Sequence, residues 1–306
     1  MNTIKIHEVG LRDGLQMEEQ VIPSETKIKW GHQLIDAGLD IIQVGSFVHP
    51  KYVPQMADTD ELFRYFATDA EKPWTDLLSG LVLNEKGLER ALDCGVEMIC
   101  AGVSASETHS QKNTKMGIDE AVDRITKIAK QARDANKVVQ LSVQSAFGCG
   151  YEGPIAEDQV LKIIGKYLDA GFTYFSLADT AGHADPNQVK RLVEKVLNLD
   201  SHIQLTGHFH NTYAMALANC IAAVQAGVEI LESSFAGLGG CPFTSVAGGN
   251  VCTEDLVHML QRMGYKIDID LDLIIATARD AAKVLNKDLP GMIYKSGSID
   301  KQFESK

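Results

Sequence analysis

The chain has 306 residues, of which 45% are hydrophobic and 23% charged, and its formal net charge is −12. This length and balance suit a soluble globular protein with one large core, such as an α/β barrel. Lysine and arginine form no cluster, so a nucleic-acid partner is not expected, and no apolar run is long enough to predict a membrane span.

Cysteine usage and the N-terminus bear on the expected compartment. The six cysteines show neither a CxxC pair nor regular spacing, so a disulfide framework or a structural zinc site is not expected. The first residues, MNTIKIHEVG, enter a strand-like run directly and lack the basic and apolar segments of a signal peptide. We therefore expect reduced thiols in the cytoplasm.

In chain order, eight short apolar segments have the composition of buried strands, at residues 4–9, 39–44, 77–83, 97–103, 138–145, 173–178, 203–209 and 228–234. Helical stretches separate them. The clearest helix follows Asp185 and Pro186, a favourable N-cap and first-turn pair. Its apolar side chains recur on one face, at Val189, Leu192, Val193, Val196 and Leu197.

A four-residue pattern marks where four of the helices end and the next strands begin. It consists of a small residue, a glycine, an apolar residue and a polar residue, and its glycines are Gly38, Gly95, Gly171 and Gly227. Glycine directly after a helix supplies the left-handed backbone conformation that ends it. The pattern therefore predicts a repeated helix-to-strand turn.

Alternation of helices with almost continuously apolar strands predicts a parallel sheet that is covered on both faces. Eight such units favour an α/β fold of the (β/α)8 TIM-barrel type over an open doubly wound sheet. We expect a single domain over residues 1–306, with additional helices at about 253–306 that cover part of the barrel.

Polar residues follow the first and seventh strands, at the barrel end where active sites lie. Arg12 and Asp13 could bring a cation and a metal-binding carboxylate to the barrel mouth, or they could form a surface salt bridge. His208 and His210 share one face of a strand, and two imidazoles in this arrangement suit a divalent metal. Either histidine could instead be a structural residue.

The eighth strand leads into a glycine-rich stretch that spans residues 236–250. Such a stretch can form a mobile lid or let backbone amides approach an anion. It lacks the GK[ST] ending of a P-loop. Cys241 lies within it, where a thiol could reach a substrate or simply be an inert loop residue.

Seven segments resemble, in the same order, the 3-hydroxy-3-methylglutaryl-CoA (HMG-CoA) lyase family: EVGLRDGLQ, SFVHPKYVPQM, SASETHSQKN, FGCGYEG, SLADTAG, HFHNTY and AGLGGCPF followed by GGN. The resemblance covers about residues 3–290. It implies a barrel enzyme of the metal-dependent lyase and Claisen-type synthase group, whose signature consists of an aspartate, an arginine and a glutamate. The implied reaction is retro-aldol or retro-Claisen cleavage of a carbon–carbon bond, giving acetyl-CoA and acetoacetate.

The resemblance implies roles for individual residues. The matching positions predict a Mg or Mn ion held by Asp13, His208, His210 and Asn250. Arg12 would stabilise the enolate, His208 would also act in acid–base chemistry, and Cys241 would be the catalytic loop cysteine. Substrate contacts are expected at Gln16, Gln43, Ser46, Asp179 and Thr180, and phosphates of a CoA thioester at Lys51, Lys112 and Asn113. A homodimer is also implied.

The chain departs from the family pattern at several positions. The signature glutamate is Gln43, which is nearly isosteric with glutamate but carries no charge, and a carboxylate after the second histidine is Asn211. Leu11, Met17 and Ala178 replace the usual proline, asparagine and glycine. Losing two negative charges near the metal suggests a more anionic substrate.

Three hypotheses follow from these departures. The chain is an HMG-CoA lyase with altered electrostatics, or a lyase for a different 3-hydroxyacyl-CoA or hydroxy acid. The third hypothesis is a non-catalytic barrel that binds CoA or a metabolite, although a complete metal set would then have no physical purpose.

Overall fold

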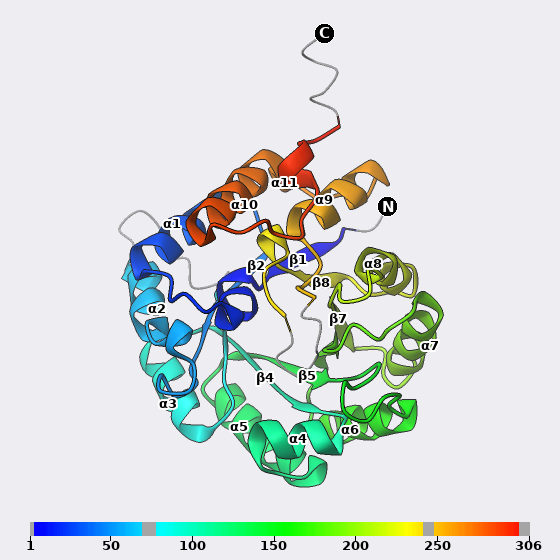
Figure 1. The fold of residues 1–306 in the computed structure, drawn as a ribbon. Helices are drawn as coiled ribbons and strands as arrows, with labels where there is room; N and C mark the ends of the chain where they lie inside the picture. The colour runs from blue at the N-terminus through cyan, green and yellow to red at the C-terminus, as the bar shows by residue number, and fades with distance from the viewer. Residues whose placement is uncertain (1–2, 69–77, 241–247, 300–306) are drawn as a thin grey trace.

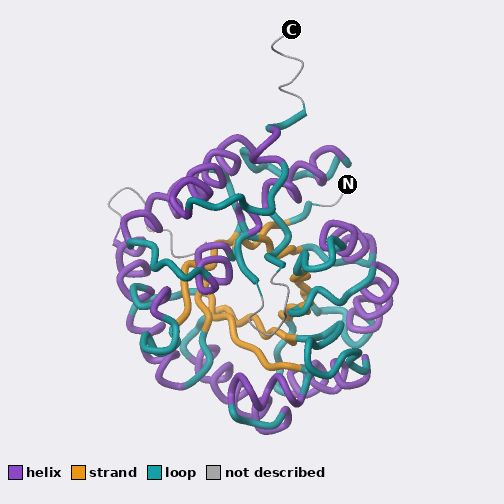
Figure 2. Tube along the Cα trace, in the orientation of Figure 1, coloured by secondary structure: helices purple, strands orange, loops and turns teal. Residues whose placement is uncertain are grey.

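The computed structural model describes residues 3–68, 78–240 and 248–299, and it contains a closed barrel of eight parallel strands. Each strand pairs with the next, and β8 pairs with β1, which closes the ring (Figures 1 and 2). The strands are β1 (Lys5–Glu8), β2 (Ile41–Ser46), β3 (Leu78–Leu81), β4 (Met98–Ser104), β5 (Val138–Gln144), β6 (Tyr174–Asp179), β7 (Gln204–Phe209) and β8 (Ile230–Ser233). The predicted (β/α)8 barrel is therefore confirmed, and an open sheet is excluded.

The helices surround the strands (Figure 2). They are α1 (Ser24–Asp36), α2 (Thr59–Thr68), α3 (Glu85–Asp93), α4 (Glu107–Thr114), α5 (Ile118–Asp134), α6 (Glu157–Asp169), α7 (Pro186–Leu197), α8 (Ala216–Gln225), α9 (Thr253–Arg262), α10 (Leu271–Leu285) and α11 (Ile293–Ser296). The last three gather on one side of the barrel, where α10 packs against α1 (Figure 1). No helix of the described ranges is both long and apolar enough to span a membrane.

The predicted helix-to-strand turns have the expected backbone. Gly38, Gly95, Gly171 and Gly227 all adopt positive φ, at 85°, 74°, 82° and 111°. Residues with a Cβ rarely adopt this conformation, so glycine at these positions ends each helix and redirects the chain into the next strand.

Helix α7 begins and packs as its sequence predicts. The carboxylate of Asp185 accepts hydrogen bonds from the amides of Asn187 and Gln188, at 2.9 and 3.1 Å. The apolar stripe is buried against the barrel, at Val189, Leu192, Val193 and Val196.

We expect Asp185→Ala to lower the free energy of unfolding by about 1 kcal/mol, because two helix amides would lose their acceptor. Urea unfolding followed by circular dichroism would measure the change. Asp185→Asn keeps an acceptor oxygen and should stay close to the wild type. Equal losses in both variants would contradict a capping role.

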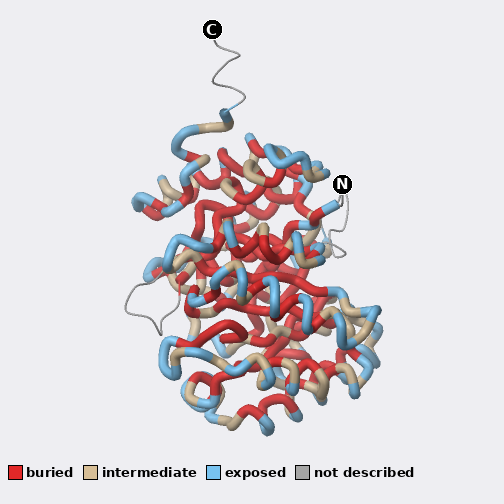
Figure 3. The backbone as a smooth tube through the Cα atoms, turned by 90° about the vertical axis from the view of Figure 1, so that its right-hand side faces the viewer, coloured by how far each residue is buried: buried red, intermediate tan, exposed pale blue. Residues whose placement is uncertain are grey.

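Buried residues run through the interior of the fold, and exposed residues lie mostly at its outer surface (Figure 3). One contact joins the start and the end of the barrel. The rings of Trp30 in α1 and Phe235 after β8 meet edge to face, with centroids 5.6 Å apart. This packing holds the segment after β8 against the N-terminal quarter of the fold, where the polar residues that follow β1 also lie.

Candidate metal centre

A tight turn follows β1 and carries Arg12 and Asp13. Residues Gly10–Gly14 form one π-helical turn, in which the amides of Arg12, Asp13 and Gly14 all point at the carbonyl of Val9. Single π-helical turns are frequent at functional sites. Gly10 is required here, because a Cβ would lie 2.6 Å from the ring of Phe235.

Asp13, His208 and His210 converge at the C-terminal ends of β1 and β7. One potential ligand atom from each lies within 4.8 Å of the others, and all three residues are buried. The Nε2 atoms of the two imidazoles are 2.9 Å apart, and they lie 4.0 and 3.7 Å from Oδ2 of Asp13. Nitrogen and carboxylate ligands that face one another at this spacing could hold a divalent cation.

Asn250 joins this group from a distant part of the sequence. It forms an isolated antiparallel bridge with His210, and its Nδ2 donates to Oδ2 of Asp13 at 2.9 Å. Its buried Oδ1 has no hydrogen-bond partner among the residues that the structure describes. An unpaired buried oxygen is costly, and coordination of a cation after rotation of the amide would satisfy it. The four residues therefore fit a metal ion.

The two carboxylate oxygens of Asp13 face different partners. Its Oδ1 accepts from Arg12 and, at 3.1 Å, from Gln16, whereas Oδ2 faces the two histidines. Burial alone would raise the pKa of Asp13, but Arg12, His210 and His208 outweigh it and hold the pKa well below its usual range. The Asp13 side chain is therefore ionised at neutral pH.

Arg12 connects the metal centre to β2. Its Nε donates to Oε1 of Gln43, while its Nη1 pairs with Asp13. The guanidinium side chain is 12% exposed, so it is held in place yet open to a ligand in the barrel mouth. Gln43 takes the position of the signature glutamate and keeps the hydrogen bond without the charge.

Two residues of the centre were missed by the sequence analysis. Glu232 in β8 accepts from Nδ1 of His208 at 2.7 Å, and Nδ1 of His7 lies 3.5 Å from its other oxygen. Burial alone would raise the pKa of Glu232, but the hydrogen bond from His208 and the proximity of His7 keep it well below its usual range. For His208, burial alone would lower the pKa, but the contact with Glu232 raises it. A glutamate and a histidine within segments predicted to be buried strands were the available signal.

The other predicted substrate contacts have mixed placements. Asp179 is fully buried. Its carboxylate accepts hydrogen bonds from the backbone amides of His183 and Ala184, at 2.8 and 3.2 Å, and so holds the loop after β6. Burial raises its pKa to about 7. Thr180 accepts the amide of Ser145 at 2.9 Å, and Ser46 is buried at the end of β2. Direct substrate contact by these three residues stays a prediction.

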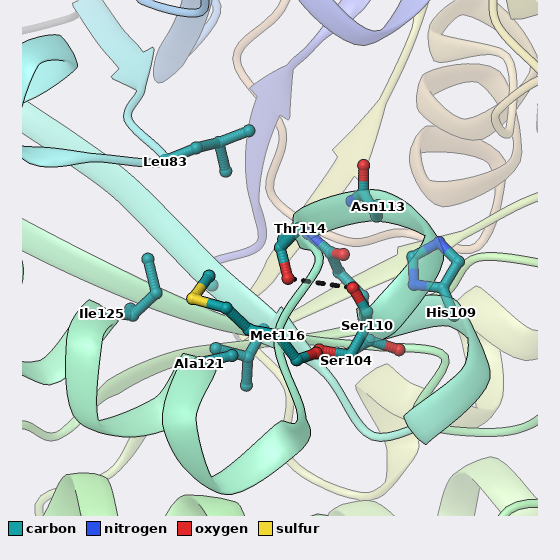
Figure 4. Close-up of a pocket in the computed structure, with 12 residues that line it drawn as sticks. Leu83, Ser104, His109, Ser110, Asn113, Thr114, Met116, Ala121 and Ile125 are labelled. Carbon is teal, nitrogen blue, oxygen red and sulfur yellow. Dashed lines mark hydrogen bonds between the residues drawn. The ribbon is translucent and has the colours of Figure 1, made fainter.

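The residues predicted to contact CoA lie in loops and helices around the barrel mouth. Lys51 is exposed, and Nζ of Lys112 lies 3.6 Å from the ring centre of Tyr151. Asn113 lines a cavity of about 20 Å³ beside α4 (Figure 4), room for about one water molecule and not for a ligand. Cys241 lies outside the described residues. These four roles therefore stay predictions.

Asn211 follows the proposed ligand His210 and contacts the start of a helix. Its side-chain oxygen accepts the amide of Ala216, at 3.2 Å, where α8 begins. Asparagine and aspartate both serve as acceptors at a helix start, so the substitution preserves this contact. An effect of the missing charge on the metal centre, next to the ligand His210, stays a prediction.

Comparisons with known proteins agree with this arrangement. Residues 3–281 match the family model described as HMGL-like. Hydroxymethylglutaryl-CoA lyase of Bacillus subtilis is 37% identical over 96% of this chain and 98% of its own length. The enzyme of Pseudomonas mevalonii is 37% identical over 90% of each chain.

The chain is also similar to solved structures of HMG-CoA lyases. An HMG-CoA lyase from Acinetobacter baumannii, in complex with coenzyme A and 3-methylmalate, superposes with a TM-score of 0.90 at 38% identity, over 97% of this chain and 96% of that one. The HMG-CoA lyase of Bacillus subtilis superposes with a TM-score of 0.91 at 36% identity, over 97% and 98%.

Proposed function

The chain belongs to the HMGL-like family and is a carbon–carbon lyase of the HMG-CoA lyase type, and we propose that it cleaves HMG-CoA to acetyl-CoA and acetoacetate with a divalent cation. The observation that carries this proposal is the convergence of Asp13, His208 and His210 beside Arg12 at the barrel mouth. Separate strands supply the anionic and imidazole ligands, and a guanidinium stands next to them.

We propose Mg²⁺ or Mn²⁺ as the cation, held by Asp13, His208, His210 and Asn250. Carboxylate and amide oxygens suit either ion, and two imidazoles shift the preference toward Mn²⁺. When bound, the cation would supply Lewis-acid chemistry toward the oxygens of the substrate. The wider proposal includes one domain over residues 1–306, a homodimer and a cytoplasmic location.

The bond changes assign work to the chain's own residues. The tertiary hydroxyl loses its proton and becomes the ketone of acetoacetate, and the electrons of the broken carbon–carbon bond form the enolate of acetyl-CoA. Arg12 would meet the negative charge that develops on the thioester oxygen. His208 would take part in proton transfer besides binding the metal, and Cys241 or a water molecule would deliver the proton to the enolate.

A second candidate substrate rests on Gln43. A glutamate here would neutralise Arg12, whereas Gln43 leaves the guanidinium with Asp13 as its only described anionic partner. The surplus positive charge would suit an acyl group with more negative charge. The Acinetobacter relative is described with coenzyme A and 3-methylmalate, which supports a CoA thioester and a hydroxy acid in such a site. The second candidate is therefore a lyase for a related 3-hydroxyacyl-CoA.

The test measures acetyl-CoA release from HMG-CoA by the purified protein with Mg²⁺, with Mn²⁺ and with EDTA, beside Gln43→Glu. We expect metal-dependent release by the wild type and none with EDTA. Release by Gln43→Glu alone would favour the second candidate, because the site would be intact but tuned to another acyl group. No release from either protein, with HMG-CoA and with other 3-hydroxyacyl-CoA thioesters, would overturn the proposed function.

A further inference from the structure

A layer of ionisable side chains crosses three adjacent strands inside the barrel. The register of the sheet pairs His208 of β7 with Glu232 of β8, and Glu232 with His7 of β1. All three side chains are almost completely buried, at 6%, 6% and 0% exposure. The pairing of β8 with β7 on one side and with β1 on the other therefore places His208 and His7, which are far apart in the sequence, on either side of one carboxylate.

Two histidines contact the carboxylate of Glu232, one on each oxygen. Nδ1 of His208 lies 2.7 Å from Oε2 of Glu232. Nδ1 of His7 faces the other oxygen at 3.5 Å, and its Nε2 lies 2.8 Å from Oγ of Ser79. A carboxylate only accepts hydrogen bonds, so the nitrogen of His208 that faces it carries the ring proton. In the neutral ring, Nε2 then has the free lone pair that a metal ligand needs.

The neighbouring histidine provides an internal contrast. His210 also directs Nε2 into the site, but its buried Nδ1 has no hydrogen-bond partner among the described residues. Glu232 thus places the ring proton of His208 on Nδ1, whereas in the metal-free protein the ring proton of His210 lies on Nε2, which donates to Nε2 of His208 at 2.9 Å. This difference makes the contact with Glu232 a specific property of His208.

Stability alone is a weak explanation for a carboxylate in this place. Removing a charged group from water costs several kcal/mol, and a well-packed apolar side chain of similar size usually serves the core as well or better. Glu232 is the ionisable residue among the four residues of β8, which are Ile230, Leu231, Glu232 and Ser233. A carboxylate that fixes a ligand's ring has a purpose that an apolar residue could not fulfil.

We propose that Glu232 and His7 are positioning residues for the metal centre. Glu232 holds His208 with its proton on Nδ1 and its Nε2 lone pair directed at the metal, and His7 holds Glu232 from the opposite side, anchored in turn by Ser79. The inference rests on the proposed metal-dependent function and extends it to residues that touch neither metal nor substrate.

The first test reads the histidine ring directly. Nitrogen-15 NMR of metal-free protein labelled at histidine, recorded at a pH where the His208 ring is neutral and with a His208→Gln sample to assign the signal, should show the His208 proton on Nδ1. In Glu232→Gln the side-chain amide can donate to the same nitrogen, so the His208 proton should appear partly on Nε2. Because Nε2 of His210 lies 2.9 Å from this atom, the His210 proton should then move in part to Nδ1. A wild-type proton on Nε2 would overturn the proposal, whether or not any variant folds.

The second test measures the Kd of Mn²⁺ by electron paramagnetic resonance without substrate. We expect Glu232→Gln to weaken binding by about 10- to 100-fold, the usual cost of losing a partner of a metal-ligating histidine. Glu232→Asp, which keeps a carboxylate, should recover part of the affinity. His7→Phe should have a smaller effect, and adding it to Glu232→Gln should cost little more, because both act through one contact.

Gln140→Leu is the matched control. Gln140 is also buried inside the barrel, and its side chain donates to Thr206 at 3.1 Å without touching His208. This variant should leave the Kd of Mn²⁺ unchanged. Equal losses of Mn²⁺ affinity in Gln140→Leu and Glu232→Gln would mean that the affinity depends on packing in the barrel interior in general, and would overturn the proposal.

The two proposals fail in different ways. If the wild type binds Mn²⁺ through a correctly protonated His208 but cleaves no acyl-CoA thioester, the proposed function fails and the positioning role stands. If the wild type cleaves HMG-CoA and Glu232→Gln keeps its Mn²⁺ affinity and its His208 tautomer, the positioning role fails and the function stands.

Discussion

Asp13→Asn is expected to abolish measurable Mn²⁺ binding and to lower kcat at least about 1000-fold, the upper range for loss of one electrostatic group. The physical reason lies in the charges around the residue. Asp13 is the one anion that faces Arg12, His208 and His210 together. Asparagine keeps the shape and one acceptor oxygen but leaves the two imidazoles and the guanidinium with no negative charge between them.

The measurements are Mn²⁺ titration and acetyl-CoA release, with thermal unfolding to check the fold. Asp119→Asn is a suitable control, because the Asp119 side chain is 66% exposed and pairs only with surface lysines, at 3.1 and 2.9 Å. Asp119→Asn should behave as the wild type. Normal Mn²⁺ affinity in Asp13→Asn would mean that the metal is bound elsewhere.

Arg12→Met is expected to lower kcat by about 100- to 1000-fold while Mn²⁺ affinity is kept or rises. The guanidinium touches Gln43 and Asp13, and in the proposed reaction it would meet the negative charge that develops on the thioester oxygen. Its removal takes a positive charge away from a cation site, so metal binding has no reason to weaken. Methionine has a similar length and should fill much of the space.

Mn²⁺ affinity should therefore be lost in Asp13→Asn but kept or raised in Arg12→Met, which distinguishes the roles of the two residues. Arg124→Gln serves as the control, because Arg124 forms a half-exposed ion pair with Glu85 at 2.6 Å, away from the centre. A loss of Mn²⁺ affinity in Arg12→Met would instead assign Arg12 the role of orienting Asp13. A kcat equal to that of the wild type would remove Arg12 from the reaction.

The contacts of Gln43 show what its difference from the family's glutamate changes at Arg12. Gln43 is 2% exposed, and its oxygen serves Arg12 as the oxygen of a glutamate would. Geometry at the arginine is therefore preserved while one charge is lost. For that reason we attribute any altered substrate preference to electrostatics at this position and not to a rearranged site.

Much of the barrel follows from local sequence. Apolar runs of strand length, helices with one buried stripe and glycines with positive φ are determined by neighbouring residues, so they can be read along the chain. The contacts of Arg12 with Asp13 and of His208 with His210 likewise join near neighbours in sequence, at the barrel end where strands deliver functional side chains.

Contacts across the barrel needed the tertiary structure. Asn250 meets Asp13 from 237 positions away, and the layer of His7, Glu232 and His208 exists only because β8 pairs with β1 and β7. Asn211 is a missing charge in the sequence, and only the structure shows that it supports the start of α8. A side chain's residue type sets the chemistry it can offer, whereas its partner depends on strand register and barrel closure, which no local pattern specifies.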